Sequence, residues 1–254
     1  MKTRTLIVCI ILATASGESL AQMPTAQPAI TAEATQALKD VSQALRRLQD
    51  YSADMKVSTR AAVGDGQYRD FVGTIGYLVK SPTHISASID GSGIQRQVYY
   101  DGQTITVHAP VERRYAQISA PGSIGTLLET LKQMRGVELP IVDFLEWASA
   151  EAPMSDVTRA RYQGSRMIAG RACEHYSYLE AGIAWEIWVD ADDLPCKLVR
   201  VDTADMGLPG YSAEMTWNRQ VSLSADDFRF TPEAGAAKVD ISVLGQTHAD
   251  ERDR

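Results

Sequence analysis

The sequence predicts a mainly β protein with α-helices. We expect one strongly curved antiparallel sheet of about 11 strands with helices on its concave side. Apolar and polar residues alternate with a period of two through most of the chain. Short Gly-rich turns such as Asp101-Gly102 separate these runs, so neighbouring strands are antiparallel. Segments with helical periodicity interrupt the strands. The apolar faces of these predicted helices must pack against the sheet.

The first helix is predicted over 32–49, because Leu38, Val41, Leu45 and Leu48 recur at helical spacing. Thr31 or Thr35 could cap it. Six strands are then expected, over 51–63, 71–79, 84–90, 94–100, 104–109 and 112–118. An insertion of two helices follows, over 123–136 and 141–149. The remaining strands are expected over 157–169, 171–180, 183–190, 196–203 and 211–222, with a final short strand within 226–239.

The first residues have the layout of a secretory signal peptide. Lys2 and Arg4 precede the apolar run 6–15, and Ser19-Leu20-Ala21 supplies the small residues of a cleavage site. We expect cleavage after Ala21 and a location in the periplasm. No later stretch is apolar enough to span a membrane. The expected organisation is a signal peptide over 1–21, a flexible lead-in over 22–30, one domain over 31–243 and a disordered charged tail over 244–254.

Composition and motifs argue against several functions. The formal net charge is −7 at pH 7, which disfavours nucleic acids and anionic membrane surfaces as partners. The four histidines show no metal-binding spacing with one another or with cysteine. The chain has no phosphate-binding loop, dinucleotide-binding motif or nucleophile elbow. We therefore expect no enzymatic activity, no catalytic residues, no metal and no cofactor.

Cys173 and Cys196 pose a question that the sequence leaves open. An exported protein with two cysteines favours a disulfide between them. With a turn at Ala181-Gly182, however, both cysteines lie opposite Asp190 and therefore two strands apart, roughly 10 Å. A disulfide requires Cα atoms within about 7 Å. A bulge in the loop over 191–195 or at Gly170 would close that gap.

Trp185 and Trp188 are three residues apart on one strand, so they point to opposite faces of the sheet. Trp185 is either ordinary core or part of a ligand cavity on the concave face. Trp188 either packs on the outer face or contacts a partner. The same register places Val199 and Val201 with Trp185, and Leu198 and Arg200 with Trp188.

Several longer stretches carry a family resemblance: GTIGYLVKSP, QVYYDGQTITVHAPVERRYAQISAPG, GVELPIVDFL, GRACEHYSYLEAGIAWEIWVD, LPCKLV and FRFTPEAGAAKV. Over about 33–241 the chain resembles a family of predicted exported proteins of proteobacteria, known mainly as a domain of unknown function. That family is related to the LolA/LolB-like lipoprotein carriers. The resemblance implies an unclosed β-barrel whose concave side is plugged by helices. In the carriers, that cavity takes the acyl chains of lipoproteins.

Two function hypotheses follow. The first is a soluble periplasmic carrier or binder of a lipid or other apolar ligand, held by apolar burial in the concave face. The second is a protein-interaction module, an envelope sensor or assembly factor, that grips a protein partner by a sheet edge. The cavity candidates are Met55, Val57, Phe71, Ile75, Tyr77, Trp185, Ile187, Tyr211, Met215 and Trp217 on the floor, with Leu127, Leu128 and Leu131 on the lid. For each of them, plain core packing is the alternative.

Overall fold

The computed structural model describes residues 29–64, 67–125, 127, 141–149, 154–203 and 210–245. The predicted signal peptide, most of the lead-in and residues 246–254 lie outside the described residues. So do the lid candidates Leu128 and Leu131 and most of the helix predicted over 123–136. The described chain comprises three α-helices and twelve strands.

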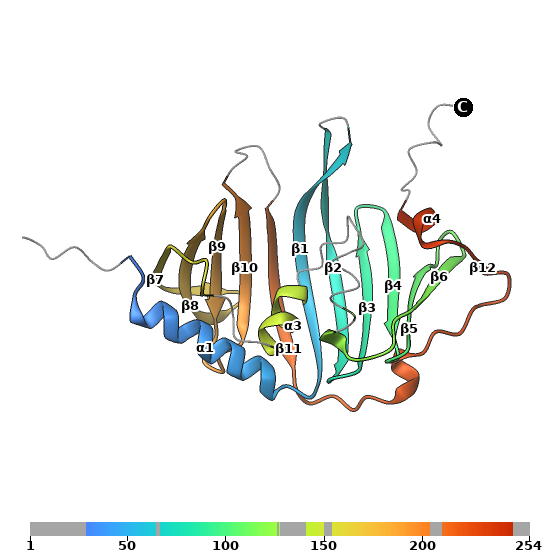
Figure 1. Cartoon of the computed structure of the whole chain (residues 1–254), viewed down its shortest axis with the longest axis horizontal. Coiled ribbons are helices and arrows are strands. Elements are labelled where there is room, and N and C mark those ends of the chain that lie inside the picture. The colour runs from blue at the N-terminus through green and yellow to red at the C-terminus, as the bar shows by residue number, and fades with distance from the viewer. Residues whose placement is uncertain are drawn as a thin grey trace, which may run out of the picture.

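The strands form a single open sheet in the order β12-β6-β5-β4-β3-β2-β1-β11-β10-β9-β8-β7 (Figure 1). Eleven strands pair antiparallel, and the two-residue β12 adds to β6 in parallel, which the sequence did not predict. The predicted fold class is confirmed. The strands are β1 (Asp50–Gly64), β2 (Gln67–Lys80), β3 (His84–Gly91), β4 (Ile94–Tyr100), β5 (Thr104–Ala109), β6 (Arg114–Ser119), β7 (Arg159–Ile168), β8 (Arg171–Glu180), β9 (Ile183–Val189), β10 (Pro195–Asp202), β11 (Tyr211–Asn218) and β12 (Ala237–Lys238).

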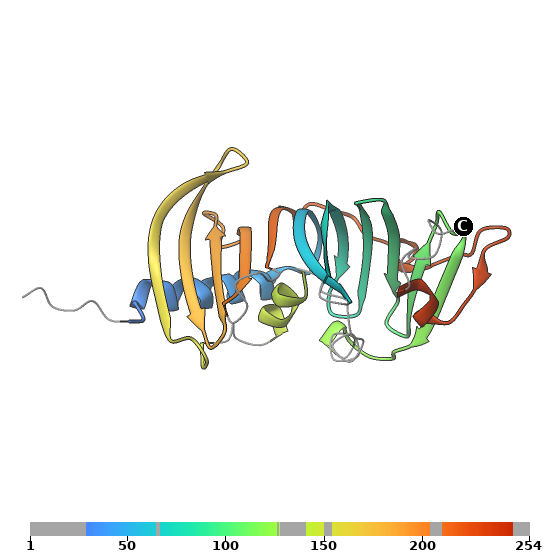
Figure 2. The same ribbon diagram turned by 90° about the horizontal axis from the view of Figure 1, so that it is seen from above.

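Helix α1 (Ala32–Arg47) forms where its apolar spacing predicts, and Thr31 caps it by accepting a hydrogen bond from the Ala34 amide at 3.3 Å. Its buried stripe packs against the face of the sheet that forms the main core. The Tyr178 hydroxyl on β8 donates to the Ala34 carbonyl at 2.9 Å and ties the first turn to the sheet. Figure 2 shows α1 running across several strands of the sheet.

Helix α3 (Ile141–Ser149) lies beside α1 over β11 and β1, as predicted for the inserted helices (Figure 1). Ile141 and Phe144 are each 1% exposed, so one side of the helix is part of the core. The other side carries acidic residues toward neighbouring strands. Both helices therefore cover the concave face.

That C-terminal segment differs from its prediction. A strand was expected within 226–239, but residues 225–228 form the 3₁₀ helix η1 (Ala225–Phe228), followed by β12 only at 237–238. Ser224 and Asp227 form a capping box that starts this turn, and Phe228 is fully buried against His84. The chain then continues through α4 (Ile241–Gly245), where Leu244 packs on β5 and β6. The start of the predicted tail therefore belongs to the domain.

Residues at the other end of the domain also join the sheet. Ile30 forms a parallel bridge with Ala160 on the edge strand β7. The Ala160 amide donates to the Ala29 carbonyl at 2.9 Å, and the Thr31 amide donates to the Ala160 carbonyl at 3.0 Å. The last two residues of the predicted lead-in, 29 and 30, are thus held by backbone hydrogen bonds.

A bulge between Pro195 and Lys197 on β10 decides whether Cys173 and Cys196 can bond and which face of the sheet the rest of β10 presents. It brings the Cα atoms of Cys173 and Cys196 to 6.7 Å, and the two residues form a disulfide past the end of β9. It also reverses the predicted orientation of β10. Leu198 pairs with Ile187 and Arg200 with Trp185, so both lie on the concave face. Val199 packs with the disulfide on the other face.

Trp188 packs on the outer face of the sheet. Its ring stacks on His175 at 4.1 Å with an interplanar angle of 8°, and the Lys197 ammonium lies 5.6 Å from its centroid. The residue is 9% exposed, and it borders the disulfide. Because of the bulge at Cys196, Lys197 lies opposite Trp188, in the position predicted for Leu198. This contact set favours the packing alternative for Trp188.

Three buried tyrosines are expected to make the folded protein less stable at high pH. Burial raises the pKa of Tyr51, Tyr77 and Tyr178 above the ordinary value of 10.0. Above that pH the unfolded chain loses phenolic protons that the folded chain still holds, so the free energy of unfolding falls as pH rises. Each tyrosine contributes a slope of about 1.4 kcal/mol per pH unit. Urea unfolding on both sides of pH 10 measures the slope.

Tyr77→Phe is the matched variant for this prediction. The Tyr77 hydroxyl is buried and has no hydrogen-bond partner among the described residues. Its removal should raise the free energy of unfolding at neutral pH by about 1 kcal/mol. Above pH 10 the free energy of unfolding should then fall less steeply, by one tyrosine's contribution of about 1.4 kcal/mol per pH unit. An unchanged slope would show that Tyr77 titrates equally in both states.

Candidate functional site

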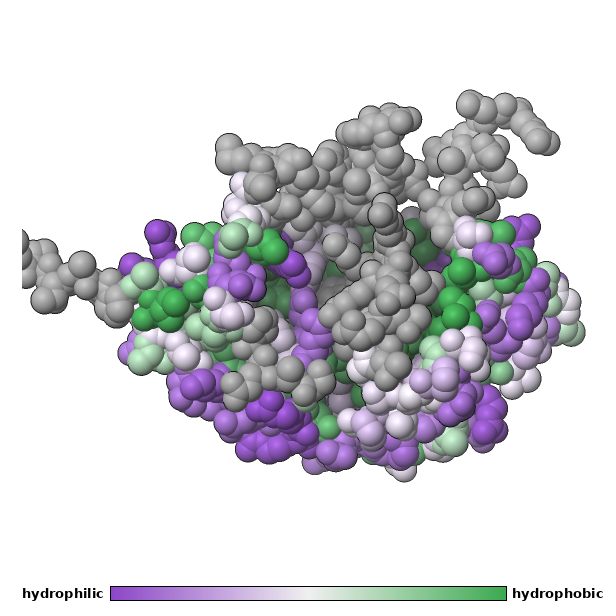
Figure 3. All heavy atoms as spheres, in the orientation of Figure 1, coloured by the Kyte–Doolittle hydropathy of each residue, from purple (hydrophilic) through white to green (hydrophobic). Residues whose placement is uncertain are grey.

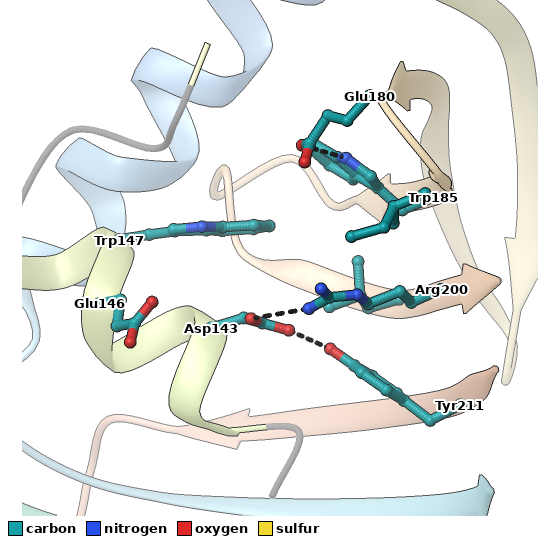
Figure 4. A pocket seen from close by; sticks show the side chains of 9 residues that line it. Asp143, Glu146, Trp147, Glu180, Trp185, Arg200 and Tyr211 are labelled. Atoms are coloured by element: carbon teal, nitrogen blue, oxygen red, sulfur yellow. Dashed lines mark hydrogen bonds and ion pairs between the residues drawn. The ribbon is translucent and has the colours of Figure 1, made fainter. Parts of the chain in front are cut away.

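A cavity of about 210 Å³ lies on the concave face between α3 and strands β8, β9, β10 and β11 (Figure 4). Its lining combines two indole rings, three carboxylates, one guanidinium, one phenol and two aliphatic side chains. The lining residues are Asp143, Glu146, Trp147, Glu180, Ile183, Trp185, Leu198, Arg200 and Tyr211.

Helix α3 supplies three of these residues. Asp143, Glu146 and Trp147 are three and four residues apart, so they share one side of the helix. The Trp147 ring meets Phe144 edge-on at 5.5 Å, which links the cavity wall to the core beneath the helix. In Figure 4, Trp147 lies between Glu180 and Trp185 on one side and Asp143 and Arg200 on the other.

The opposite wall is Trp185 on β9. Its ring stacks on Tyr178 at 4.0 Å with an interplanar angle of 14°, and its centroid lies 5.7 Å from that of Trp147. The indole nitrogen donates to the Glu180 carboxylate at 2.8 Å. Stacking and this hydrogen bond fix both the plane and the direction of the ring. Trp185 is 6% exposed, so most of its surface is in contact with protein.

The lower wall is an ion pair. Arg200 on β10 lies 3.7 Å from Asp143, and the Tyr211 hydroxyl on β11 donates to the other oxygen of the same carboxylate (Figure 4). These contacts join α3 to two strands and hold Asp143 in place. Arg200 reaches the cavity only because the bulge on β10 turns its side chain to the concave face.

The predicted floor residues reach the concave side, but most of them are buried. Trp185 and Tyr211 line the cavity. The candidates buried in the core are Met55, Val57, Ile75, Tyr77, Leu127, Ile187 and Met215. Phe71 and Trp217 are partly buried against that core. Whether any of these residues contacts a ligand stays a prediction.

Sequence reasoning missed seven residues of the lining. Asp143, Glu146 and Trp147 had a signal, because their spacing puts them on one side of a predicted helix. Arg200 and Leu198 had no local signal, since a regular strand would point both away from the cavity. Glu180 and Ile183 flank the turn before Trp185, where polar and apolar residues are both common.

The same face carries a long apolar row. Cross-strand pairs join Trp217 to Ala53, Ala53 to Tyr77 and Tyr77 to Ala87, and the series continues from β3 to β6. The complete row is Trp217, Ala53, Tyr77, Ala87, Val98, Val107 and Ala116. Figure 3 looks onto this face, where apolar spheres lie in the central hollow and polar spheres along the lower rim near α1.

A family model described as "Predicted periplasmic protein (DUF2092)" matches residues 34–242, most of the chain. The chain belongs to this DUF2092 family. No curated protein matches it. In the described part of the chain, no helix is long and apolar enough to cross a membrane. Nor do the described histidine, cysteine and acidic residues form a group of three or more that could hold a metal ion.

Solved structures similar to this DUF2092 protein include members of the LolA superfamily. LprF from Mycobacterium bovis has 11% identity and a TM-score of 0.45, over 77% of this chain and 98% of that one. The Pseudomonas aeruginosa MucA/MucB complex has 14% identity and a TM-score of 0.43, over 79% and 62%. A LolA superfamily protein from Nitrosomonas europaea has 11% identity and a TM-score of 0.36, over 78% and 97%.

Proposed function

We propose that this protein is a soluble periplasmic protein that binds a lipid or other apolar ligand on the concave face of its sheet. The observation behind the proposal is the uninterrupted apolar row from Trp217 on β11 to Ala116 on β6. Six inter-strand spacings of about 4.8 Å give it a length of about 29 Å. The hydrocarbon core of a bilayer, two acyl layers thick, is about 30 Å. The row is therefore long enough for an acyl chain.

Residue size supports this use of the row. Three of its seven members are small residues, Ala53, Ala87 and Ala116, separated from one another by larger side chains. Trp217 and Val98 are only partly buried although they pack against the core. A ligand that removes about 200 Å² of apolar surface from water gains about 5 kcal/mol without directional bonds.

Native mass spectrometry of the mature protein, purified from periplasm without detergent, tests the proposal. We expect a polypeptide that begins at Gln22 and extra mass that organic solvent extracts as lipid. A bare polypeptide, with no mass shift after addition of lysolipid or fatty acid, would contradict the proposal. The polypeptide mass separately tests cleavage after Ala21.

Two valine variants make this experiment specific. Val98→Asp places a charge on the partly buried apolar row and should abolish the lipid mass. Val72→Asp is the matched control, since Val72 is 62% exposed and points to the opposite face of β2 from Tyr77, the member of the row on that strand. Lipid retained in both variants would place the ligand elsewhere.

A protein partner is the second candidate function, favoured by the edge strand β7. In the described part of the chain, only Ala160 of β7 pairs outward, with Ile30. Tyr162 and Met167 on this strand are 43% and 66% exposed. Such an edge can accept an added strand from another protein. Lipid-free protein that co-purifies with a polypeptide, and loses it in Met167→Asp, would favour this alternative.

A further inference from the structure

The segment that contains the edge strand β7 is a basic exception in an acidic protein. Residues 159–171 include four arginines and no acidic residue, although the formal net charge of the chain is −7. Arg159 and Arg166 lie opposite Leu179 and Cys173 on β8, so both point to the outer face of the sheet. Both are exposed, and neither forms an ion pair within the described part of the chain.

The chain's own N-terminal residues cover only the first part of this edge. The amide and the carbonyl of Ala160 bond to Ala29 and Thr31. The bridge between Ile30 and Ala160 is parallel, and α1 begins at Ala32, so the chain leaves the edge there instead of following β7. β7 is the last strand of the sheet (Figure 1), and no other described residue pairs with its outward side.

The turn after β7 determines which backbone groups remain free. Ala169 and Gly170 have φ angles of 46° and 82°, as in a two-residue hairpin turn. The pair that closes such a turn is hydrogen-bonded across the hairpin, so by alternation the amides and carbonyls of Ser165 and Met167 point outward. The Arg166 guanidinium donates to the Ser165 carbonyl at 3.0 Å, which agrees with this direction.

The β7–β8 hairpin is fixed to the rest of the sheet. Cys173 on β8 is bonded to Cys196 on β10. Arg171, at the start of β8, lies 3.4 Å from the Asp190 carboxylate and donates to the Met215 carbonyl on β11. Because the hairpin is already held, a strand that adds to β7 need not order it, and less conformational entropy opposes binding.

Charge decides what kind of strand fits this edge. Opposite charges on neighbouring strands attract, and like charges repel. The outer face offers Arg159 and Arg166. The concave face offers exposed Tyr162 and Met167, and Glu174 lies beside them and accepts from the Tyr162 hydroxyl. Acidic residues are therefore favoured on the outer face alone. A second copy paired through β7 would bring arginine close to arginine, which disfavours self-association.

We propose that β7 accepts an extended segment of another protein in which acidic and uncharged residues alternate. The acidic side chains face Arg159 and Arg166, and the uncharged ones face Tyr162 and Met167. The inference rests on the second candidate function, a protein partner at β7, and names the chemistry of that partner. It is independent of lipid binding, because the apolar row runs from β11 to β6 and does not include β7.

Nuclear magnetic resonance titration of the mature protein with three synthetic peptides of equal length tests this inference. One alternates glutamate and valine, the second has lysine in place of glutamate, and the third is the acidic peptide with every backbone nitrogen methylated. We expect only the unmodified acidic peptide to bind, because it alone has both the charge and the backbone donors. Its binding should slow hydrogen exchange of the Ser165 and Met167 amides and should weaken as ionic strength rises.

Charge variants locate the contact. Arg166→Glu should weaken binding of the acidic peptide by about tenfold, because an attraction becomes a repulsion of similar size. Arg166→Lys keeps the charge and should retain most of the affinity. Arg114→Glu is the matched control, since Arg114 is exposed on β6, near the other end of the sheet, and its replacement changes the net charge equally. The amide spectrum verifies that each variant is folded.

Several results would overturn the inference. One is equal binding of the lysine peptide or the methylated peptide, and another is binding that leaves the Ser165 and Met167 amides unprotected. A dimer of the protein alone that protects these amides would assign the edge to a second copy. Phosphatidylglycerol vesicles that bind the wild type but not Arg166→Glu would assign it to a membrane surface.

The proposals can fail separately. A co-purified polypeptide that is lost in Met167→Asp but retained in Arg166→Glu would overturn the acidic segment and leave a protein partner at β7 standing. The lipid mass measured by native mass spectrometry should be the same in Arg166→Glu and the wild type. Its loss in Arg166→Glu would contradict the independence of β7 from the apolar row.

Discussion

Phe144→Ala is expected to lower the free energy of unfolding by about 3–5 kcal/mol, the range for removing a large buried aromatic side chain. Phe144 is 1% exposed and meets Trp147 and Trp217 edge-on at 5.5 and 5.9 Å. It joins α3 to the floor of the sheet, so its removal leaves a cavity among aromatic rings that cannot close around it. Urea unfolding followed by circular dichroism measures the loss.

Val142→Ala is the matched control on the same helix. Val142 is only partly buried against the core, so its loss should cost about 1 kcal/mol or less. The two variants together separate a general weakening of α3 from loss of the aromatic contact. A Phe144→Ala protein within 1 kcal/mol of the Val142→Ala protein would show that α3 contributes little to the folded state. Ligand binding should fall with Phe144→Ala, because α3 carries part of the cavity wall.

Removal of the disulfide is expected to lower the free energy of unfolding by about 3 kcal/mol. Cys173 and Cys196 are 23 residues apart, and a closed loop of that length restricts the unfolded chain by about this amount. Both residues are at most 1% exposed, so serine in their place would also bury hydroxyl groups in an apolar cluster. The oxidised and reduced wild-type proteins should therefore be compared first, by urea unfolding.

The control for reduction is the double variant Cys173→Ser/Cys196→Ser. A reducing agent should lower the stability of the wild type and leave that of the double variant unchanged. Thiol titration of the denatured, unreduced mature protein should find no free thiol. Two free thiols, or equal stability with and without reductant, would contradict the assignment of the bond.

Local patterns accounted for most of the fold. The helix over 32–49 matches α1 within two residues, because its apolar residues at helical spacing and the Thr31 cap are all local in the sequence. The period-two alternation and short turns predicted that consecutive strands pair antiparallel, since a tight turn brings the second strand back beside the first. The final short strand lies within the predicted segment, at 237–238, but its parallel pairing with β6 was not predicted, because that pairing depends on a segment distant in sequence.

The candidate site was predicted less well than the fold. Trp185 and Tyr211 were correctly placed on the concave face, because alternation fixes the face of an apolar residue in a regular strand. The charged lining was not anticipated. Helical spacing placed Asp143 and Glu146 on one side of a predicted helix. A carboxylate on an amphipathic helix normally faces water, however, so strands from elsewhere in the chain were not expected to enclose them.

The sequence by itself determined the strand and helix pattern, the curved antiparallel sheet and the apolar concave face, since each depends on residues close in the chain. The tertiary structure decided which side of β10 meets the cavity. One extra residue at Cys196 turns Leu198 and Arg200 to the concave face and brings Cys173 within bonding distance. A bulge depends on how a strand pairs with its neighbours and with a distant cysteine, so the local pattern of β10 could not predict it.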